Sequence, residues 1–325
     1  MPLPPPAARG HAVLRRRLSA VLVLISLSAS LFACGTTDTV RSDDDTCATG
    51  RSLAVGTKQH VLERDGQKRV YLVHVPPAYD GSTRTPVVFL FHGLGGSAAA
   101  MLQTTRMADL ADRSGFIVVA PQARGAVSTW DFRTRESTVR SDLGFVKSLV
   151  TTIKGQACVD SSRVYAAGFS NGSALTLALA CDGSTPFAAY GAVSAPYYVS
   201  RCESSPPASI IYFHGMADRV VPFGGAQTAI GPLPGVNRAL SEWQVHDDCP
   251  STGSTTTVTA RVRHFAWESC RDGSAVEMYA VANGGHRWPG GTESTPGHGD
   301  GVTTQDIDAS TLIWNFFERH PRGGQ

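Results

Sequence analysis

Short apolar runs that alternate with helical segments constrain the fold of this chain most strongly. Residues 87–91 and 116–120 are runs of five without a charged side chain, which is typical of strands buried on both faces. Residues 98–113, between them, are predicted to form a helix. Because strand, helix and strand in this order favour parallel pairing, the pattern predicts an α/β protein with a mostly parallel sheet and helices on both faces.

Further strands and helices are expected before and after these residues. Residues 61–75 are expected to form an antiparallel hairpin that turns at Asp65-Gly66. The helix predicted over 142–154 begins with Asp142, which is expected to cap it rather than to react. Later strands are expected at 164–167, just before 194, at 209–213, 258–264 and 275–281, and later helices at 171–180, 236–245 and around 307–317. With no internal repeat and no long linker after residue 50, residues 51–325 are predicted to form one catalytic domain.

The N-terminal segment carries the pattern of an export signal. Three arginines, Arg15 to Arg17, precede sixteen uncharged residues at 18–33, fewer than the ~20 that span a bilayer as a helix. The segment closes with Leu31-Phe32-Ala33-Cys34-Gly35, which resembles a bacterial lipobox and implies that Cys34 becomes the lipidated first residue. Phe32 departs from that pattern, so ordinary cleavage and full secretion remain an alternative. Residues 1–34 are thus predicted to be a signal peptide and residues 35–50 a polar linker.

Composition excludes two classes of protein. A hydrophobic content of 42% supports a sizeable core and excludes a disordered chain. Lys and Arg number 29 against 27 Asp and Glu, and four of the positive residues precede Cys34. A nearly neutral body without a basic run lacks the electrostatic footprint of nucleic-acid binding. The only membrane contact we expect is through a lipid on Cys34.

The cysteines favour disulfides over a metal site. Six remain after Cys34, an even number that suits an oxidising compartment, and they allow fifteen connectivities. No C-x-x-C pair occurs, so we expect no metal and no cofactor. Their places relative to the predicted elements favour three pairs: Cys158 with Cys181, Cys249 with Cys270, and Cys47 with Cys202.

A candidate nucleophile follows the strand at 164–167. Gly168-Phe169-Ser170-Asn171-Gly172 is a Gly-x-Ser-x-Gly pattern between a predicted strand and a predicted helix. In such a turn the serine occupies a tight bend with its hydroxyl pointing out of the sheet, and the flanking glycines avoid collisions with neighbouring elements. The pattern alone is weak because glycine is common in this chain, and its position between strand and helix strengthens it.

Three further groups also follow predicted strands. His92-Gly93-Leu94-Gly95-Gly96 comes after residues 87–91, and its backbone can present N–H groups to a developing oxyanion, most plainly that of Leu94 together with that of Asn171. Asp218 follows the strand at 209–213, and His286 follows the strand at 275–281.

The order of these residues along the chain indicates their chemistry. Ser170, Asp218 and His286 stand in the order nucleophile, acid, base, which is the order of the α/β-hydrolase fold. His286 would take the proton of Ser170 during attack on an ester carbonyl, and Asp218 would hold the imidazole in the required tautomer. The predicted fold is therefore an α/β-hydrolase with a serine catalytic triad.

Four motifs occur together in this chain: His92-Gly93, Gly168-Phe169-Ser170-Asn171-Gly172, His214-Gly215-x-x-Asp218 and Gly285-His286-x-Trp288-Pro289. Together they resemble one family, the secreted polyhydroxybutyrate depolymerases and feruloyl esterases, which includes bacterial lipoprotein esterases and relatives of carbohydrate esterase family one. The likeness spans about residues 56–321. The resemblance implies that His92, Trp130 and Trp288 contact substrate, with the two tryptophans as walls of the cleft.

These observations predict an exported, metal-independent serine esterase that forms an acyl-enzyme. Its expected substrates are short-chain or aromatic acyl esters, small or attached to a polymer, with plant polysaccharide and hydroxyalkanoate oligomers as candidates. Two alternatives remain open. One is a serine peptidase of the same fold, and the other is a non-catalytic, surface-tethered carbohydrate-binding protein that keeps the hydrolase shell.

Overall fold

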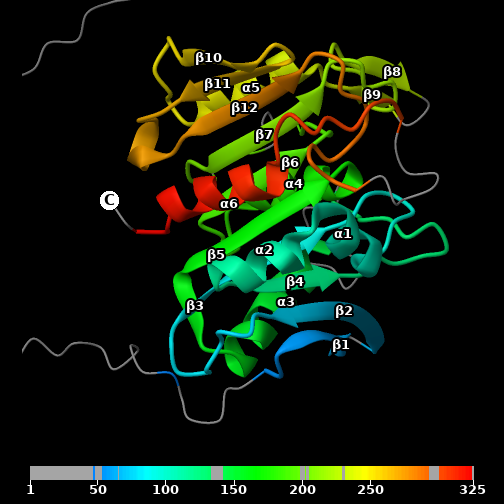
Figure 1. Ribbon diagram of the computed structural model, residues 1–325, viewed down its shortest axis with the longest axis vertical. Helices are drawn as coiled ribbons and strands as arrows, with labels where there is room; N and C mark the ends of the chain where they lie inside the picture. The colour runs from blue at the N-terminus through cyan, green and yellow to red at the C-terminus, as the bar shows by residue number, and fades with distance from the viewer. Residues whose placement is uncertain are drawn as a thin grey trace, which may run out of the picture. The chain divides into compact units, whose positions relative to one another are not determined.

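Among the described residues of the computed structural model, ten strands form one sheet (Figure 1). The structure describes residues 47, 53–64, 66–132, 142–197, 202, 205–228, 231–292 and 300–323, which belong to the unit Asp44–Gln325. Cys34, the predicted signal peptide and most of the predicted linker lie outside these residues. No described helix has the length and apolar character needed to cross a membrane.

The sheet has a parallel centre and antiparallel ends. The six central strands pair in parallel with one another, whereas the two strands at each end of the sheet pair antiparallel with their neighbours. Strands β8 (Ala226–Thr228) and β9 (Gly231–Leu233) form a separate small hairpin. The strand order is β1 (Gly56–Arg64), β2 (Gln67–Val75), β4 (Ile117–Pro121), β3 (Thr85–Phe91), β5 (Val159–Phe169), β6 (Ala189–Val193), β7 (Ser209–Gly215), β12 (Val276–Val281), β11 (Val262–Trp267) and β10 (Ser254–Thr259).

Helices cover both faces of this sheet, as the alternation predicts. Each face of the sheet carries a hydrophobic core cluster. Because side chains alternate along a strand, Phe89 and Phe91 belong to the first cluster and Val88 and Leu90 to the second. The first cluster includes α3 (Asp142–Gln156), α4 (Asn171–Asp182) and α5 (Val236–His246), and the second includes α1 (Ala98–Thr105), α2 (Met107–Ser114) and α6 (Ala309–Arg319). Figure 1 shows α1, α2 and α6 together in front of the strands. The α/β-hydrolase prediction is confirmed.

The predicted N-terminal hairpin is present. In β1 and β2, Arg64 lies opposite Gln67, which leaves two residues for the turn. Gly66 has a φ of 73°, a value that a two-residue hairpin turn requires and that glycine adopts without strain.

Two predicted elements are divided in the structure. The helix expected over 98–113 breaks at Arg106, which has a φ of 50° and donates a 2.8 Å hydrogen bond to the carbonyl of Gly290. The strand expected over 258–264 is instead the junction of β10 and β11, which turn back after Thr259. A short 3₁₀ helix, Arg271–Gly273, then precedes β12. The break at Arg106 coincides with a tertiary contact, whereas the turn between β10 and β11 is a local hairpin turn.

Two of the three predicted disulfide pairs are wrong. The structure joins Cys249 to Cys270 as predicted, but it joins Cys47 to Cys158 and Cys181 to Cys202. Strand β5 begins at Val159, earlier than expected, and the carbonyl of Cys158 accepts a bond from Thr85 at the start of β3. Cys158 therefore lies beside the entry to β3, where it pairs with Cys47, whereas Cys181 near the end of α4 pairs with Cys202.

We expect the double variant Cys249→Ala/Cys270→Ala to unfold more easily than the wild type. The disulfide closes a loop with a sequence separation of 21 residues, which constrains the unfolded chain by about 3 kcal/mol. Urea unfolding followed by circular dichroism measures this loss. A decrease below about 1 kcal/mol would contradict the expected contribution.

Candidate active site

The candidate residues gather where the helices that connect the strands change from one face of the sheet to the other. Strand β3 leads into α1 and α2 on one face, whereas α3 crosses on the other face to bring the chain to β5, beside β3. Such a switch point opens a crevice at the carboxyl ends of the strands, where ligands bind in open α/β sheets. His92 follows β3, Ser170 follows β5, Asp218 lies three residues past β7, and His286 lies in the loop after β12.

Ser170 occupies a strained turn between β5 and α4. Its φ and ψ are 53° and −120°, which a non-glycine residue adopts at a cost of about 1–3 kcal/mol. A Cβ at Gly168 would collide with the carbonyl of Gly172, and a Cβ at Gly172 would collide with the carbonyl of Phe91. The two glycines therefore allow the strand, the turn and the helix to approach closely, as the motif predicts.

The structure brings Ser170, His286 and Asp218 together. His286 Nε2 lies 2.9 Å from Ser170 Oγ, and His286 Nδ1 lies 2.7 Å from Asp218 Oδ2. Because a carboxylate only accepts hydrogen bonds, the Nδ1–H donates to Asp218 and Nε2 accepts from the serine hydroxyl. This arrangement can remove a proton from Ser170 and orient the base that receives it.

The carboxylate of Asp218 is held in a fixed position. Its side chain is fully buried, and Oδ1 accepts bonds from the N–H groups of Val220 (2.9 Å) and Val221 (2.8 Å). One oxygen is thus occupied by the backbone, so Oδ2 faces His286.

His214 is a second buried histidine beside Asp218, and the sequence motif gave it no role. Its Nε2 donates to the carbonyl of Val221 at 2.8 Å, so its Nδ1 accepts the hydroxyl of Tyr212 at 2.7 Å. Burial lowers the pKa of His214 to about 4 and raises the pKa of Tyr212 well above its usual value. His214 is therefore neutral near pH 7, and its Nε2 lies 3.5 Å from Asp218 Oδ2. The short spacing of His214 and Asp218 in the motif His214-Gly215-x-x-Asp218 is the sequence feature that could have indicated this contact.

The N–H groups of Leu94 and Asn171 are available as oxyanion donors. Asn171 is the first residue of α4, where backbone N–H groups have no partner within the helix. The carbonyl of Gly93 accepts from His92 Nδ1 (2.7 Å) and from the N–H of Gly96 (3.0 Å). A trans peptide is planar, so the Leu94 N–H points away from that carbonyl. Over the residues that the structure describes, neither donor makes an internal hydrogen bond.

His92, which is predicted to contact substrate, is also held by hydrogen bonds within the protein. It borders the cavity, but Nε2 accepts the N–H of Ala123 at 3.1 Å and Nδ1 donates to the carbonyl of Gly93. Both ring nitrogens are thus engaged by the protein. His92 thus shapes the loop that carries Leu94, and its contact with substrate stays a prediction.

A cavity of about 230 Å³ adjoins Ser170 and His286. Most of its lining is apolar and includes Leu94, Met101 and Trp288. The structure places Trp288 in this lining, where its indole N–H donates to Ser310 Oγ at 3.1 Å and fixes the ring.

Trp130 does not form the second aromatic wall that the resemblance implied. Its side chain is 2% exposed and does not border the cavity. The indole N–H donates to the carbonyl of His92 at 2.8 Å, and the ring packs edge-on against Phe91. The substrate-binding prediction for Trp130 is wrong because this hydrogen bond turns the indole into the protein interior.

Comparison with known proteins gives a consistent family. The family model described as Esterase PHB depolymerase matches residues 69–238, more than half of the chain. A similar protein is the Putative esterase NocK of Nocardia uniformis subsp. tsuyamanensis, 27% identical over 70% of this chain and 72% of that protein. Feruloyl esterase B of Piromyces equi is 27% identical over 67% of this chain and 42% of that protein, so the match spans less than half of this longer relative.

Solved structures show the same fold at low sequence identity. An acetyl xylan esterase from Aspergillus awamori has a TM-score of 0.59 at 15% identity, with 80% of this chain and 99% of that chain covered. An S-formylglutathione hydrolase from Agrobacterium tumefaciens has a TM-score of 0.53 at 14% identity, with 83% and 98% covered.

Acidification should destabilise the protein in part through His214. Its pKa is about 4 when folded and 6.5 when exposed, so the unfolded chain binds the proton more tightly. This contribution to stability is complete above pH 6.5 and is lost as the pH falls toward 4, by about 3 kcal/mol in total. We expect His214→Gln, whose amide can bond both Tyr212 and Val221, to show a shallower decline. Urea unfolding of both proteins between pH 7 and pH 4 tests this, and parallel declines would contradict it.

Proposed function

The chain belongs to the esterase PHB depolymerase family and is a carboxylic ester hydrolase, and from this premise we propose that it is an exported serine esterase. The observation that carries the proposal is the continuous hydrogen-bonded connection from Ser170 Oγ through His286 to buried Asp218. These three side chains are far apart in the sequence and meet beside an apolar cavity.

We propose that the reaction passes through an acyl-enzyme. Ser170 Oγ bonds to the ester carbonyl carbon while His286 Nε2 takes the hydroxyl proton, and Asp218 stabilises the resulting imidazolium. The N–H groups of Leu94 and Asn171 hold the carbonyl oxygen as it becomes an oxyanion. When the carbon–oxygen bond breaks, His286 gives its proton to the departing alcohol. Water then attacks the acyl group, passes a proton to His286, and the acid leaves as Ser170 regains its hydrogen.

The proposed substrates are short-chain or aromatic acyl esters. The small cavity beside Ser170 is lined mostly by apolar side chains, which suits an uncharged acyl group. Similar proteins include Feruloyl esterase B and the Bifunctional acetylxylan esterase/xylanase XynS20E of Neocallimastix patriciarum, which support esters on plant polysaccharide as candidates. Hydroxybutyrate oligomers remain a candidate through the family description.

We also propose that the protein is exported. Three disulfides suit an oxidising compartment, because cytosolic thiols are kept reduced. The arginines and the apolar run before Cys34 support a signal peptide, and the lipobox-like end supports lipidation of Cys34.

An intact nucleophile, base and acid favour an enzyme over a carbohydrate-binding protein with a hydrolase shell. We expect the purified wild type to hydrolyse p-nitrophenyl butyrate and Ser170→Ala to lose this activity. Release of p-nitrophenol measures both rates, and equal rates in the two proteins would contradict the mechanism. The same comparison with methyl ferulate, acetylated xylan, hydroxybutyrate oligomers and a p-nitroanilide peptide ranks the substrates and tests the peptidase alternative.

Asp218→Asn should lower kcat by roughly 10⁴-fold with little change in the fold. An asparagine amide presented to Nδ1 would favour the His286 tautomer with a proton on Nε2, which cannot accept the serine proton. Steady-state kinetics with p-nitrophenyl butyrate measures the loss. A decrease of tenfold or less would show that Asp218 does not orient the base.

A further inference from the structure

We propose that Trp130 is a positioning residue that aligns both N–H donors of the oxyanion hole. The inference rests on the proposed serine esterase function and assigns Trp130 to the hole instead of to the substrate cleft. Trp130 would act through its neighbours without touching the substrate.

Trp130 bonds to both sides of the hole. Its indole N–H donates to the carbonyl of His92 at 2.8 Å, and its backbone N–H donates to Asn171 Oδ1, also at 2.8 Å. His92 lies two residues before Leu94, and Asn171 itself provides the second donor. One residue therefore connects the loop after β3 to the first turn of α4.

The segment around Trp130 holds the loop after β3 at further points. The N–H of Ala123 donates to the ring of His92, and the carbonyl of Ser128 accepts the N–H of Gly95 at 3.0 Å. The Gln122 amide donates to Ser128 Oγ at 2.6 Å and to the carbonyl of Gly96 at 3.3 Å. These bonds hold the ring of His92 and the peptides that follow Leu94.

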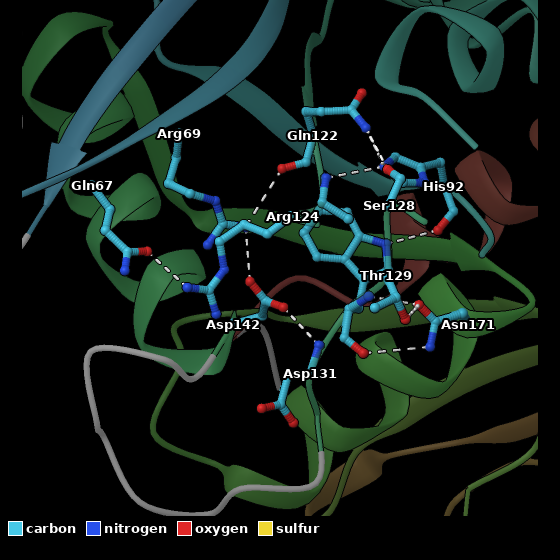
Figure 2. A network of polar contacts seen from close by, with 12 residues as sticks. Gln67, Arg69, His92, Gln122, Arg124, Ser128, Thr129, Asp131, Asp142 and Asn171 are labelled. Carbon is cyan, nitrogen blue, oxygen red and sulfur yellow. Dashed lines mark hydrogen bonds and ion pairs between the residues drawn. The ribbon is translucent and has the colours of Figure 1, made fainter. Parts of the chain in front are cut away.

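A buried ion pair holds the other end of this segment. Asp142 Oδ1 lies 2.8 Å from Arg69 Nη2, and Asp142 Oδ2 accepts the N–H of Asp131, next to Trp130, at 2.6 Å. Figure 2 shows this chain of contacts from Arg69 and Asp142 to His92 and Asn171. Asp142 thus fixes a loop, where the sequence suggested a helix cap. Because a buried ion pair contributes little net stability, its geometric effect on Asp131 is the more direct consequence.

Such alignment matters most in the transition state. The oxyanion forms only as Ser170 attacks, so donors that move out of line weaken the transition state more than the bound substrate. Loss of one oxyanion donor typically costs 10²–10³ in kcat. Because misalignment is milder than removal of a donor, we expect a loss of about 10- to 100-fold.

The test compares two conservative tryptophan variants. Trp130→Phe keeps an aromatic ring and removes the N–H that bonds His92. Trp243→Phe is the matched control, because Trp243 is also buried and its indole N–H has no partner among the described residues. With p-nitrophenyl butyrate, we expect Trp130→Phe to lower kcat about 10- to 100-fold at a KM within about twofold of the wild type, and Trp243→Phe to retain wild-type kinetics.

A trifluoromethyl ketone provides the readout that is specific to the oxyanion. It adds to the serine as a tetrahedral anion, so its inhibition constant should rise in Trp130→Phe by the same factor as kcat falls. A purely structural effect would lower the fraction of active enzyme, measured by active-site titration, and leave the inhibition constant unchanged. Equal kcat values in Trp130→Phe and Trp243→Phe, or a change confined to KM, would overturn the proposal.

A second variant keeps the proposal testable if Trp130→Phe does not fold. Asn171→Ala keeps the backbone N–H of residue 171 and removes the acceptor of Trp130, so kcat should fall in the same range. An unchanged kcat in Asn171→Ala would overturn the inference. Failure of the proposed function is distinguishable, because the wild type would then be no faster than Ser170→Ala.

Discussion

The strained turn at Ser170 is the constraint on which the site depends. A serine holds a φ of 53° only when its surroundings offset the cost. Here the Ser170 N–H bonds the carbonyl at the end of β6, and its own carbonyl accepts the N–H of Ala174 in the first turn of α4. The sheet and the helix therefore hold the turn from both sides. The hydroxyl gains a fixed direction that a flexible loop would not provide.

The acid and the base meet because two loops approach closely. A Cβ at Gly215 would collide with the carbonyl of Gly284, and the N–H of Ala217 donates to that same carbonyl at 3.0 Å. Strands β7 and β12 are adjacent and parallel, so both loops leave the same edge of the sheet. Parallel pairing thus brings Asp218 and His286 within hydrogen-bond distance although 68 residues separate them.

The sequence predicted the features that depend on local pattern. Apolar runs, the glycine-flanked Ser170 and the order of Ser170, Asp218 and His286 gave the fold and the residues that the structure brings together. Trp130 and two of the three cysteine pairs were mispredicted because they depend on which loops lie side by side. A tryptophan beside a cleft and a tryptophan bonded beneath it have the same sequence signal. The hydrogen bond to the carbonyl of His92, in the loop after β3, distinguishes them.

The site divides into two halves with different physical requirements. Around His286 and Asp218 the proton must move in a dry environment, and neutral His214 contributes a dipole without a competing charge. Around Leu94 and Asn171 the oxyanion requires backbone dipoles that are already fixed in direction. Without them, water dipoles would have to reorient around the oxyanion at each turnover. Ser170 lies between these halves, with His286 at its hydroxyl and Asn171 next in the chain. Separate buried networks stiffen the two halves. The strained turn at Ser170 is the feature that both halves share.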